Sequence, residues 1–107
     1  MGLFKRTQRT DHTEPSHDEV LAKDVVPRTR LRVIGTVLRM KTKPAAGLPT
    51  LVVTIGDDDG RVQAHWSGRR SIPGVTLGAR IIIEGVGTPT PDGVMFLNPL
   101  YEIVSQH

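Results

Sequence analysis

Hydrophobic and polar residues alternate along much of the chain, with the period of two that is typical of strands with one buried face. The segment 50–55 is the clearest case, because Leu51, Val53 and Ile55 would face one side and mostly threonines the other. Comparable patterns predict further strands over 30–39, 61–66, 80–86 and 93–104. Five strands and almost no helix indicate an all-β domain.

Glycine, proline and aspartate mark the turns between these strands. The segment 57–60, Asp-Asp-Asp-Gly, is a tight turn, and Asp59-Gly60 is a strong hairpin signal. Gly35 stands where the first strand would bulge or bend. Pro99 cannot donate a backbone hydrogen bond, so the last strand should lie at an edge or bend there.

The N-terminal part follows a different pattern. Ser16 and Glu19 have the spacing of a capping box, which predicts a short helix over His17–Asp24 that ends before Pro27. The residues before it include few large apolar side chains and cannot bury enough surface to become ordered. We therefore expect a disordered, charged tail (1–15), a short helix and linker (16–27) and a folded domain (28–107).

The folded part is too short for two full sheets. Five short strands with a bent first strand fit a closed or nearly closed small barrel, and closure removes exposed strand edges. The length of 107 residues corresponds to one domain. An SH3-like barrel has a similar number of strands and stays open as an alternative architecture.

Positive charge is concentrated in the first half of this domain. The formal net charge is only +3, from 14 Lys and Arg against 11 Asp and Glu. From Arg28 to Lys43, however, every charged residue is basic, and Arg61 follows after a single acidic turn. A basic stripe of this kind raises the local concentration of a polyanion.

Several functional classes lack support in the sequence. Cysteine is absent, which excludes disulfides, thiolate metal sites and cysteine nucleophiles. We find no signal peptide, no apolar run that could span a bilayer and no common catalytic or phosphate-loop motif. The three adjacent aspartates of 57–59 do not have calcium-loop spacing, and His12 and His17 lack further metal ligands. We expect a cytoplasmic, non-enzymatic protein without membrane insertion, metal or cofactor.

The run from His65 to Val75, His-Trp-Ser-Gly-Arg-Arg-Ser-Ile-Pro-Gly-Val, is the most distinctive part of the chain. Together with Leu77-Gly78, Ile83-Glu84-Gly85 and Asn98-Pro99-Leu100-Tyr101-Glu102, it resembles a family of small actinobacterial OB-fold (oligonucleotide/oligosaccharide-binding) nucleic-acid-binding proteins. The chain is also similar, more distantly, to the OB-type wedge domain of a branch-migrating DNA helicase and to anticodon-binding OB domains. The resemblance implies a five-stranded OB-type Greek-key barrel with a short or absent helix between strands three and four.

In an OB fold the ligand crosses the second and third strands, between the loops that flank them. The polar face of 61–66 would then supply a phosphate contact, an amide for a base edge and a ring that can stack. The expected nucleic-acid-binding residues are Arg39, Lys41, Lys43, Arg61, Gln63, His65, Arg69 and Arg70. The ligand would be single-stranded or distorted DNA, or RNA, bound mainly through its backbone. Alternatively, these residues are only the solvated face of an antiparallel sheet.

Aromatic residues are scarce, at 4% of the chain. Alternation directs Trp66 into the core, and a base-stacking platform is the alternative role for it. A protein–protein adaptor built on the same barrel is the competing function. It would need a contiguous exposed apolar patch, for which Val52, Ile82 and Leu97 are the candidates.

Overall fold

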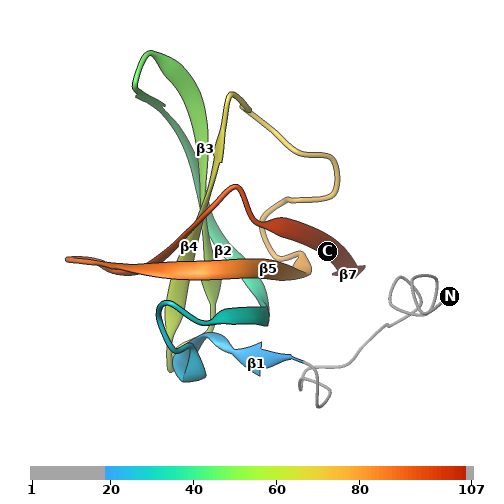
Figure 1. The fold of residues 1–107 in the computed structure, drawn as a ribbon. Coiled ribbons are helices and arrows are strands. Elements are labelled where there is room, and N and C mark those ends of the chain that lie inside the picture. Colours follow the sequence, from blue (N-terminus) through green and yellow to red (C-terminus); the bar gives the residue numbers. More distant parts are fainter. Residues whose placement is uncertain (1–18, 106–107) are drawn as a thin grey trace, which may run out of the picture.

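The structure is a computed structural model that describes residues 19–105 (Figure 1). Its strands are β1 (Val20–Leu21), β2 (Arg30–Ala45), β3 (Leu48–Gly56), β4 (Arg61–Ser67), β5 (Arg80–Thr90), β6 (Gly93–Leu97) and β7 (Leu100–Ser105). Within this range the only helix is the short 3-10 helix η1 (Ala22–Asp24). The predicted all-β class with almost no helix is confirmed.

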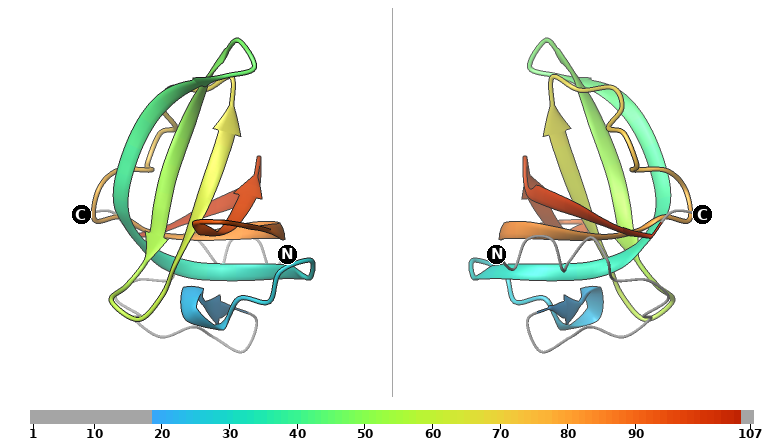
Figure 2. Two further views of the ribbon diagram at one scale, coloured as in Figure 1. Left: turned by 90° about the vertical axis from the view of Figure 1, so that its left-hand side faces the viewer. Right: turned by 90° about the vertical axis from the view of Figure 1, so that its right-hand side faces the viewer.

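The seven strands form one mixed sheet that curls back on itself. Their order is β1-β2-β3-β4-β6-β5-β7, and β2 also pairs with β5. Five strands therefore form a partly ring-like arrangement, which both views of Figure 2 show. Strands that are neighbours in this ring run antiparallel, except for β4 and β6, which run parallel. β1 pairs with β2, and β7 pairs with β5.

β2 is long enough to belong to both halves of the ring. Residues 30–36 pair with β5, and residues 36–45 pair with β3. The bulge predicted at Gly35 lies instead at Leu38, where the register with β3 shifts. Gly35 is needed for a different reason: a Cβ there would lie 2.6 Å from Cγ2 of Ile55. The missing side chain lets β2 lie close against the end of β3 where the two halves meet.

The inner face of the ring holds the hydrophobic core. Leu51, Val53 and Ile55 on β3 lie opposite Trp66, Ala64 and Val62 on β4. All six are buried in one cluster, which β2, β5 and β6 complete with further alternate residues. Burial of this apolar face is the main source of stability for a sheet of this size. The predicted inward face of both strands, including Trp66, is confirmed.

Part of the outer face is covered too. Where β1, β2, β5 and β7 lie side by side, Ile34, Ile82 and Val104 form a second small cluster with Leu21 packed against it. Ile82 is only 1% exposed, so its predicted place in an exposed patch is wrong. The prediction of five strands implied that this face is exposed, because it did not include β1 or recognise β7 as a separate strand.

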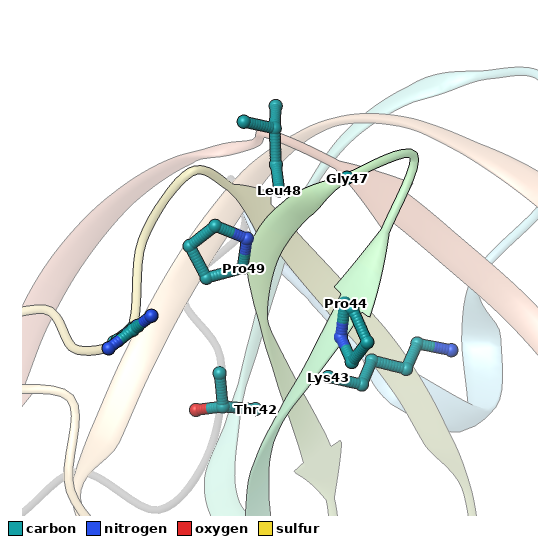
Figure 3. A pocket seen from close by; sticks show the side chains of 7 residues that line it. Thr42, Lys43, Pro44, Gly47, Leu48 and Pro49 are labelled. Carbon is teal, nitrogen blue, oxygen red and sulfur yellow. The ribbon is translucent and has the colours of Figure 1, made fainter.

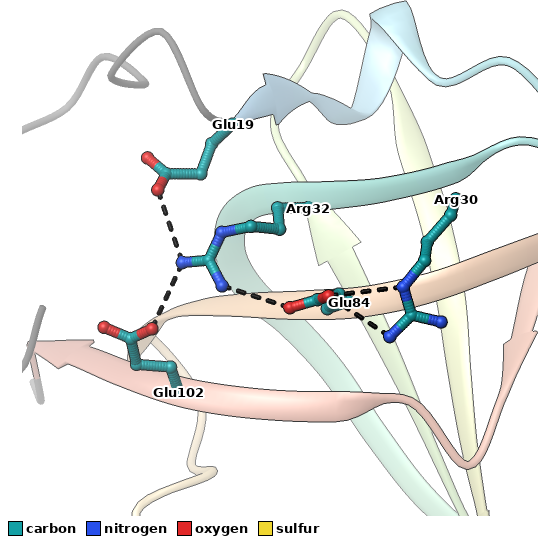
Figure 4. A network of polar contacts seen from close by, with 5 residues as sticks. All are labelled: Glu19, Arg30, Arg32, Glu84 and Glu102. Atoms are coloured by element: carbon teal, nitrogen blue, oxygen red, sulfur yellow. Dashed lines mark hydrogen bonds and ion pairs between the residues drawn. The ribbon is translucent and has the colours of Figure 1, made fainter. Parts of the chain in front are cut away.

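A network of charged side chains lies on the same four strands. The guanidinium of Arg32 contacts Glu19, Glu84 and Glu102 at 3.4, 3.2 and 3.2 Å, and Arg30 shares Glu84 at 3.1 Å (Figure 4). Burial opposes the charge of Arg32, but hydrogen bonds with Glu102, Glu84 and Glu19 outweigh it and raise the pKa of Arg32. The network joins the residue before β1 to β2, β5 and β7.

The N-terminal helix predicted over His17–Asp24 is not formed in the part of that range that the structure describes. Val20 and Leu21 instead pair in parallel with Val33 and Ile34, and η1 follows them. A helix of two turns is marginal alone, and pairing beside β2 brings these apolar residues against the barrel. The start of the predicted helix and the predicted tail (1–15) lie outside the described residues.

Two other segments refine the sequence prediction. The connection between the predicted strands 30–39 and 50–55 is mostly a paired hairpin, because β2 continues to Ala45 and β3 begins at Leu48. Ala46 and Gly47 form its turn with positive φ angles of 54° and 81°.

The last predicted strand is divided at Asn98-Pro99 into β6 and β7, which confirms the bend at this proline. The prediction of a short or absent helix before the fourth barrel strand also agrees with the structure, which has none between β4 and β5.

Candidate functional site

Basic side chains line the outer face of β2 beyond its bulge. Residues that pair directly across neighbouring strands project to the same side of a sheet. The rows running from β2 across β3 to β4 are Arg39–Thr54–Gln63, Lys41–Val52–His65 and Lys43–Thr50–Ser67. We call the surface made by these rows and Arg61 the basic face. It brings together six of the eight predicted site residues: Arg39, Lys41, Lys43, Arg61, Gln63 and His65.

Gln63 and His65 are hydrogen-bonded to each other on this face. Nε2 of His65 lies 3.0 Å from Oε1 of Gln63. An amide oxygen can only accept, so Nε2 carries the hydrogen and Nδ1 remains an acceptor. Burial lowers the pKa of His65, and the charges of Lys43 and Lys41 lower it further. Near neutral pH the pair therefore presents an acceptor on His65 and the NH2 donors of Gln63.

Arg61 lies at the other end of β4, among acidic residues. Its Nε is 3.5 Å from the backbone oxygen of Asp57. A hollow of about 180 Å³ is lined by Arg61, Arg39, Gln63 and Asp92, among others. The carboxylate of Asp57 accepts hydrogen bonds from the backbone of Asp59 and Gly60 at 2.8 and 3.2 Å, so it stabilises its own turn.

The basic face is consequently polarised. Acidic side chains border it at the Arg61 end, whereas the sequences of β2, β3 and 61–83 contain no acidic residue. Near Arg61, the carboxylates of Asp57 and Asp92 would compete with a phosphate group for the cation. Near Lys43, neither β2 nor β3 supplies a carboxylate. The hairpin end is electrostatically the better place for a polyanion.

The two remaining predicted residues follow β4. The backbone N–H of Gly68 donates to the oxygen of Pro49 at 2.7 Å, which holds the start of this loop against the β2–β3 hairpin. Arg70 then lines a hollow of about 530 Å³ with residues of the hairpin tip (Figure 3). We call it the hairpin hollow; its other lining residues are Thr42, Lys43, Pro44, Gly47, Leu48 and Pro49. Arg69 is exposed in the same loop and does not line the hollow.

Trp66 is almost entirely buried in the core. It is 5% exposed, and its Nε1 donates to the oxygen of Pro99 at 3.0 Å. Tyr101 packs against it edge to face, with 5.9 Å between the ring centroids. The alternative role of Trp66 as a stacking platform is therefore wrong. The rows of the basic face contain no aromatic ring except the imidazole of His65.

The apolar patch expected for an adaptor is not formed by its candidate residues. Val52 is 2% exposed, because it lies in the middle row between Lys41 and His65. Ile82 is buried in the outer cluster with Ile34 and Val104, and only Leu97 of the three candidates is exposed, at 60%. We expected Val52 to be exposed, and this is wrong. It lies on β3, a central strand, between the long side chains of Lys41 on β2 and His65 on β4.

Sequence reasoning missed two parts of the site. Asp92 sits in the segment Pro-Asp-Gly, which indicates only a turn, and it lines the same hollow as Arg61 because β6 runs parallel to β4. Leu48 and Pro49 suggest only a loop, and their contribution to a hollow follows from the extended hairpin. Neither place could be found without the strand pairing.

Among residues 19–105, no group of three His, Asp or Glu side chains is placed to hold a metal ion. The same range includes no helix that is long and apolar enough to cross a membrane. No protein-family model matches the chain, and no match was found among curated proteins.

Proposed function

We propose that this protein is a non-enzymatic nucleic-acid-binding module on an OB-type barrel, and that nucleic acid binds across the basic face. The observation that carries the proposal is the alignment of Arg39, Lys41 and Lys43 on β2 opposite Gln63 and His65 on β4. Alternate strand residues are about 7 Å apart, so the three cations form a line that a charged backbone can follow.

The strand pairing supports the OB assignment. The ring order β2-β3-β4-β6-β5, with β2 returning to β5, agrees with a five-stranded Greek-key barrel. The parallel pairing of β4 with β6 favours this assignment over the SH3-like alternative. The resemblance of 65–75 and the other quoted segments to small OB-fold proteins agrees with it. In that fold, the outer face of β3 and β4 is where a nucleic acid would lie.

The composition of the face supports binding that depends on the phosphate backbone. Stacking on aromatic rings usually adds about 1–3 kcal/mol per base, and the basic face offers only the imidazole for this. Arginine and lysine contribute electrostatic attraction that does not depend on sequence. The paired Gln63 and His65 offer a donor and an acceptor for base edges, which would give modest selectivity. We therefore propose single-stranded or distorted DNA, or RNA, as the ligand.

Fluorescence anisotropy of the full chain with labelled single-stranded DNA, duplex DNA and RNA tests the proposal. With four contacts, from Arg39, Lys41, Lys43 and one loop arginine, affinity for a single strand should fall about fiftyfold for a roughly fourfold rise in salt. Lys41→Glu should weaken binding strongly and reduce this salt dependence. Lys23→Glu, an equal charge reversal on exposed η1 outside the basic face, should have little effect.

Two results would contradict the proposal. The first is an absence of binding to all three nucleic acids even at low salt, which would favour the adaptor function instead. The second is an equal loss of affinity in the Lys41 and Lys23 variants, because binding would then depend on net charge rather than on the basic face.

A further inference from the structure

The hairpin hollow faces away from the row of lysines. Thr42, Pro44 and Pro49 lie on the side of the hairpin opposite to Lys41. Nearer the barrel, the same side carries Met40 and Leu51, which pack in the core. In Figure 3 the ammonium group of Lys43 extends away from Thr42 and Pro49. The basic face and the hollow are thus two sides of one hairpin.

The chemical character of the hollow differs from that of the basic face. Pro44 and Pro49 pair directly across the two strands, and Leu48 beside them is 50% exposed. Arg70 stands across from them on the loop after β4, and no acidic residue lines the hollow. The hollow therefore combines an open apolar surface with a cation, which suits a ligand that has both a flat apolar part and a negative charge.

A nucleotide has this combination of properties. The basic face supplies cations, but Val52 is buried in it and it offers no wide apolar surface to a base. The volume of about 530 Å³ is within the range of about 300–1,000 Å³ that is usual for small-ligand sites. A phosphate alone would not need the two prolines and the leucine, and a cationic ligand would be repelled by Arg70.

We propose that the hairpin hollow receives one base of a strand whose backbone follows the basic face, with Arg70 contacting the neighbouring phosphate. This inference rests on the proposed function. The strand passes around the hairpin edge at Lys43, which lines the hollow and also belongs to the basic face. The base packs on Pro44, Leu48 and Pro49, and the hydroxyl of Thr42 can meet its edge. The hollow then supplies the base contact that the basic face does not offer.

NMR titration of the full chain with two oligonucleotides tests this placement. One is a short thymidine strand, and the other is the same backbone with abasic residues. The ordinary strand should shift the amide signals of Lys41 and His65 on the basic face and those of Gly47 and Leu48 at the hollow. The abasic strand should shift only the first pair, because it has phosphates and no base.

The outcomes separate this inference from the proposed function. No shift with either strand would mean that the proposed function has failed. Shifts on the basic face alone with both strands would overturn the inference and leave the proposed function intact. Equal shifts at the hollow with both strands would also overturn it, since the hollow would then bind phosphate and not a base.

Two variants with matched controls give an independent measurement. Leu48→Ser should lower affinity for the ordinary strand about five- to tenfold, without changing the salt dependence or affinity for the abasic strand. Arg70→Gln should reduce the slope of log affinity against log salt by about 0.7. Leu77→Ser and Arg28→Gln change exposed residues outside both surfaces and should leave binding unchanged. Wild-type affinity in both hollow variants would overturn the inference.

Discussion

Replacing Trp66 with phenylalanine tests whether this side chain is part of the core and not a platform on which bases stack. The indole is 5% exposed and donates to the oxygen of Pro99 at 3.0 Å. Phenylalanine keeps an aromatic ring in the core but has no donor. The oxygen of Pro99 would lose this partner, and a small cavity would remain beside Leu51, which pairs with Trp66 across the strands.

The cost follows from these two losses. A buried acceptor that loses its partner costs about 1–3 kcal/mol, and the smaller ring adds about 1 kcal/mol for the cavity. The sum of about 2–4 kcal/mol is a large part of the stability of a small domain. For a domain of this size each kcal/mol lowers Tm by about 4–8 °C, so a fall of at least about 8 °C is expected.

Thermal and urea unfolding followed by far-UV circular dichroism measures this change without depending on tryptophan emission. Tyr101→Phe is the control, because it keeps the edge contact with Trp66 and removes only the hydroxyl of a 41% exposed residue. Its stability should change by less than about 0.5 kcal/mol. In the wild-type protein, nucleic acid should leave the emission of this single tryptophan nearly unchanged. A Trp66→Phe protein that unfolds at the wild-type temperature but binds poorly would refute the structural role.

Three further predictions concern charge. Asp92→Asn should strengthen nucleic-acid binding about two- to fivefold in an anisotropy titration, because it removes a carboxylate beside Arg61; weaker binding would contradict the polarised face. Acidification from about pH 7.5 to about pH 5.5 should tighten binding, since His65 gains charge and bound phosphate raises its pKa. The free protein should become slightly less stable over the same pH range. The pKa of His65 is lower in the folded protein than its ordinary value of 6.5, so the unfolded chain binds more protons as the pH falls through this value. Both the change in binding and the change in stability should disappear in His65→Asn. Arg32→Met should cost about 2–4 kcal/mol in urea unfolding, because Glu19, Glu84 and Glu102 would then repel one another, and an unchanged midpoint would show that the network is dispensable.

The strand positions were the part of the fold most accessible from sequence. Period-two alternation identifies residues such as Val53 and Ala64 as inward-facing, and the structure buries both. Asp59-Gly60 correctly indicates the hairpin between β3 and β4. These features depend on neighbouring residues in the chain, so a local pattern is enough to find them.

Other features depend on contacts between distant segments and could not be predicted. Val20 and Leu21 become a strand because they pair with Val33 and Ile34, although the local capping pattern favours a helix. The burial of Val52 depends on two neighbouring strands, and the place of Asp92 near Arg61 depends on a parallel pairing with β4. The basic residues of β2 could be proposed as a site from the sequence. To know which of them share a face, however, the register of β2 with β3 is needed.

Pro44 in the hairpin also affects how molecules of this protein meet one another. Beyond the bulge, the edge of β2 that does not face β3 has no strand partner among the described residues. Bare edges of this kind invite strands from other chains, and inserted prolines and lysines are common ways to prevent it. Pro44 on this edge lacks the backbone donor that such pairing needs, and Lys41 and Lys43 would bring like charges together. Molecules of this protein that meet at high local concentration, as they would along one strand of nucleic acid under the proposed function, can therefore stand side by side without aggregating through their hairpins.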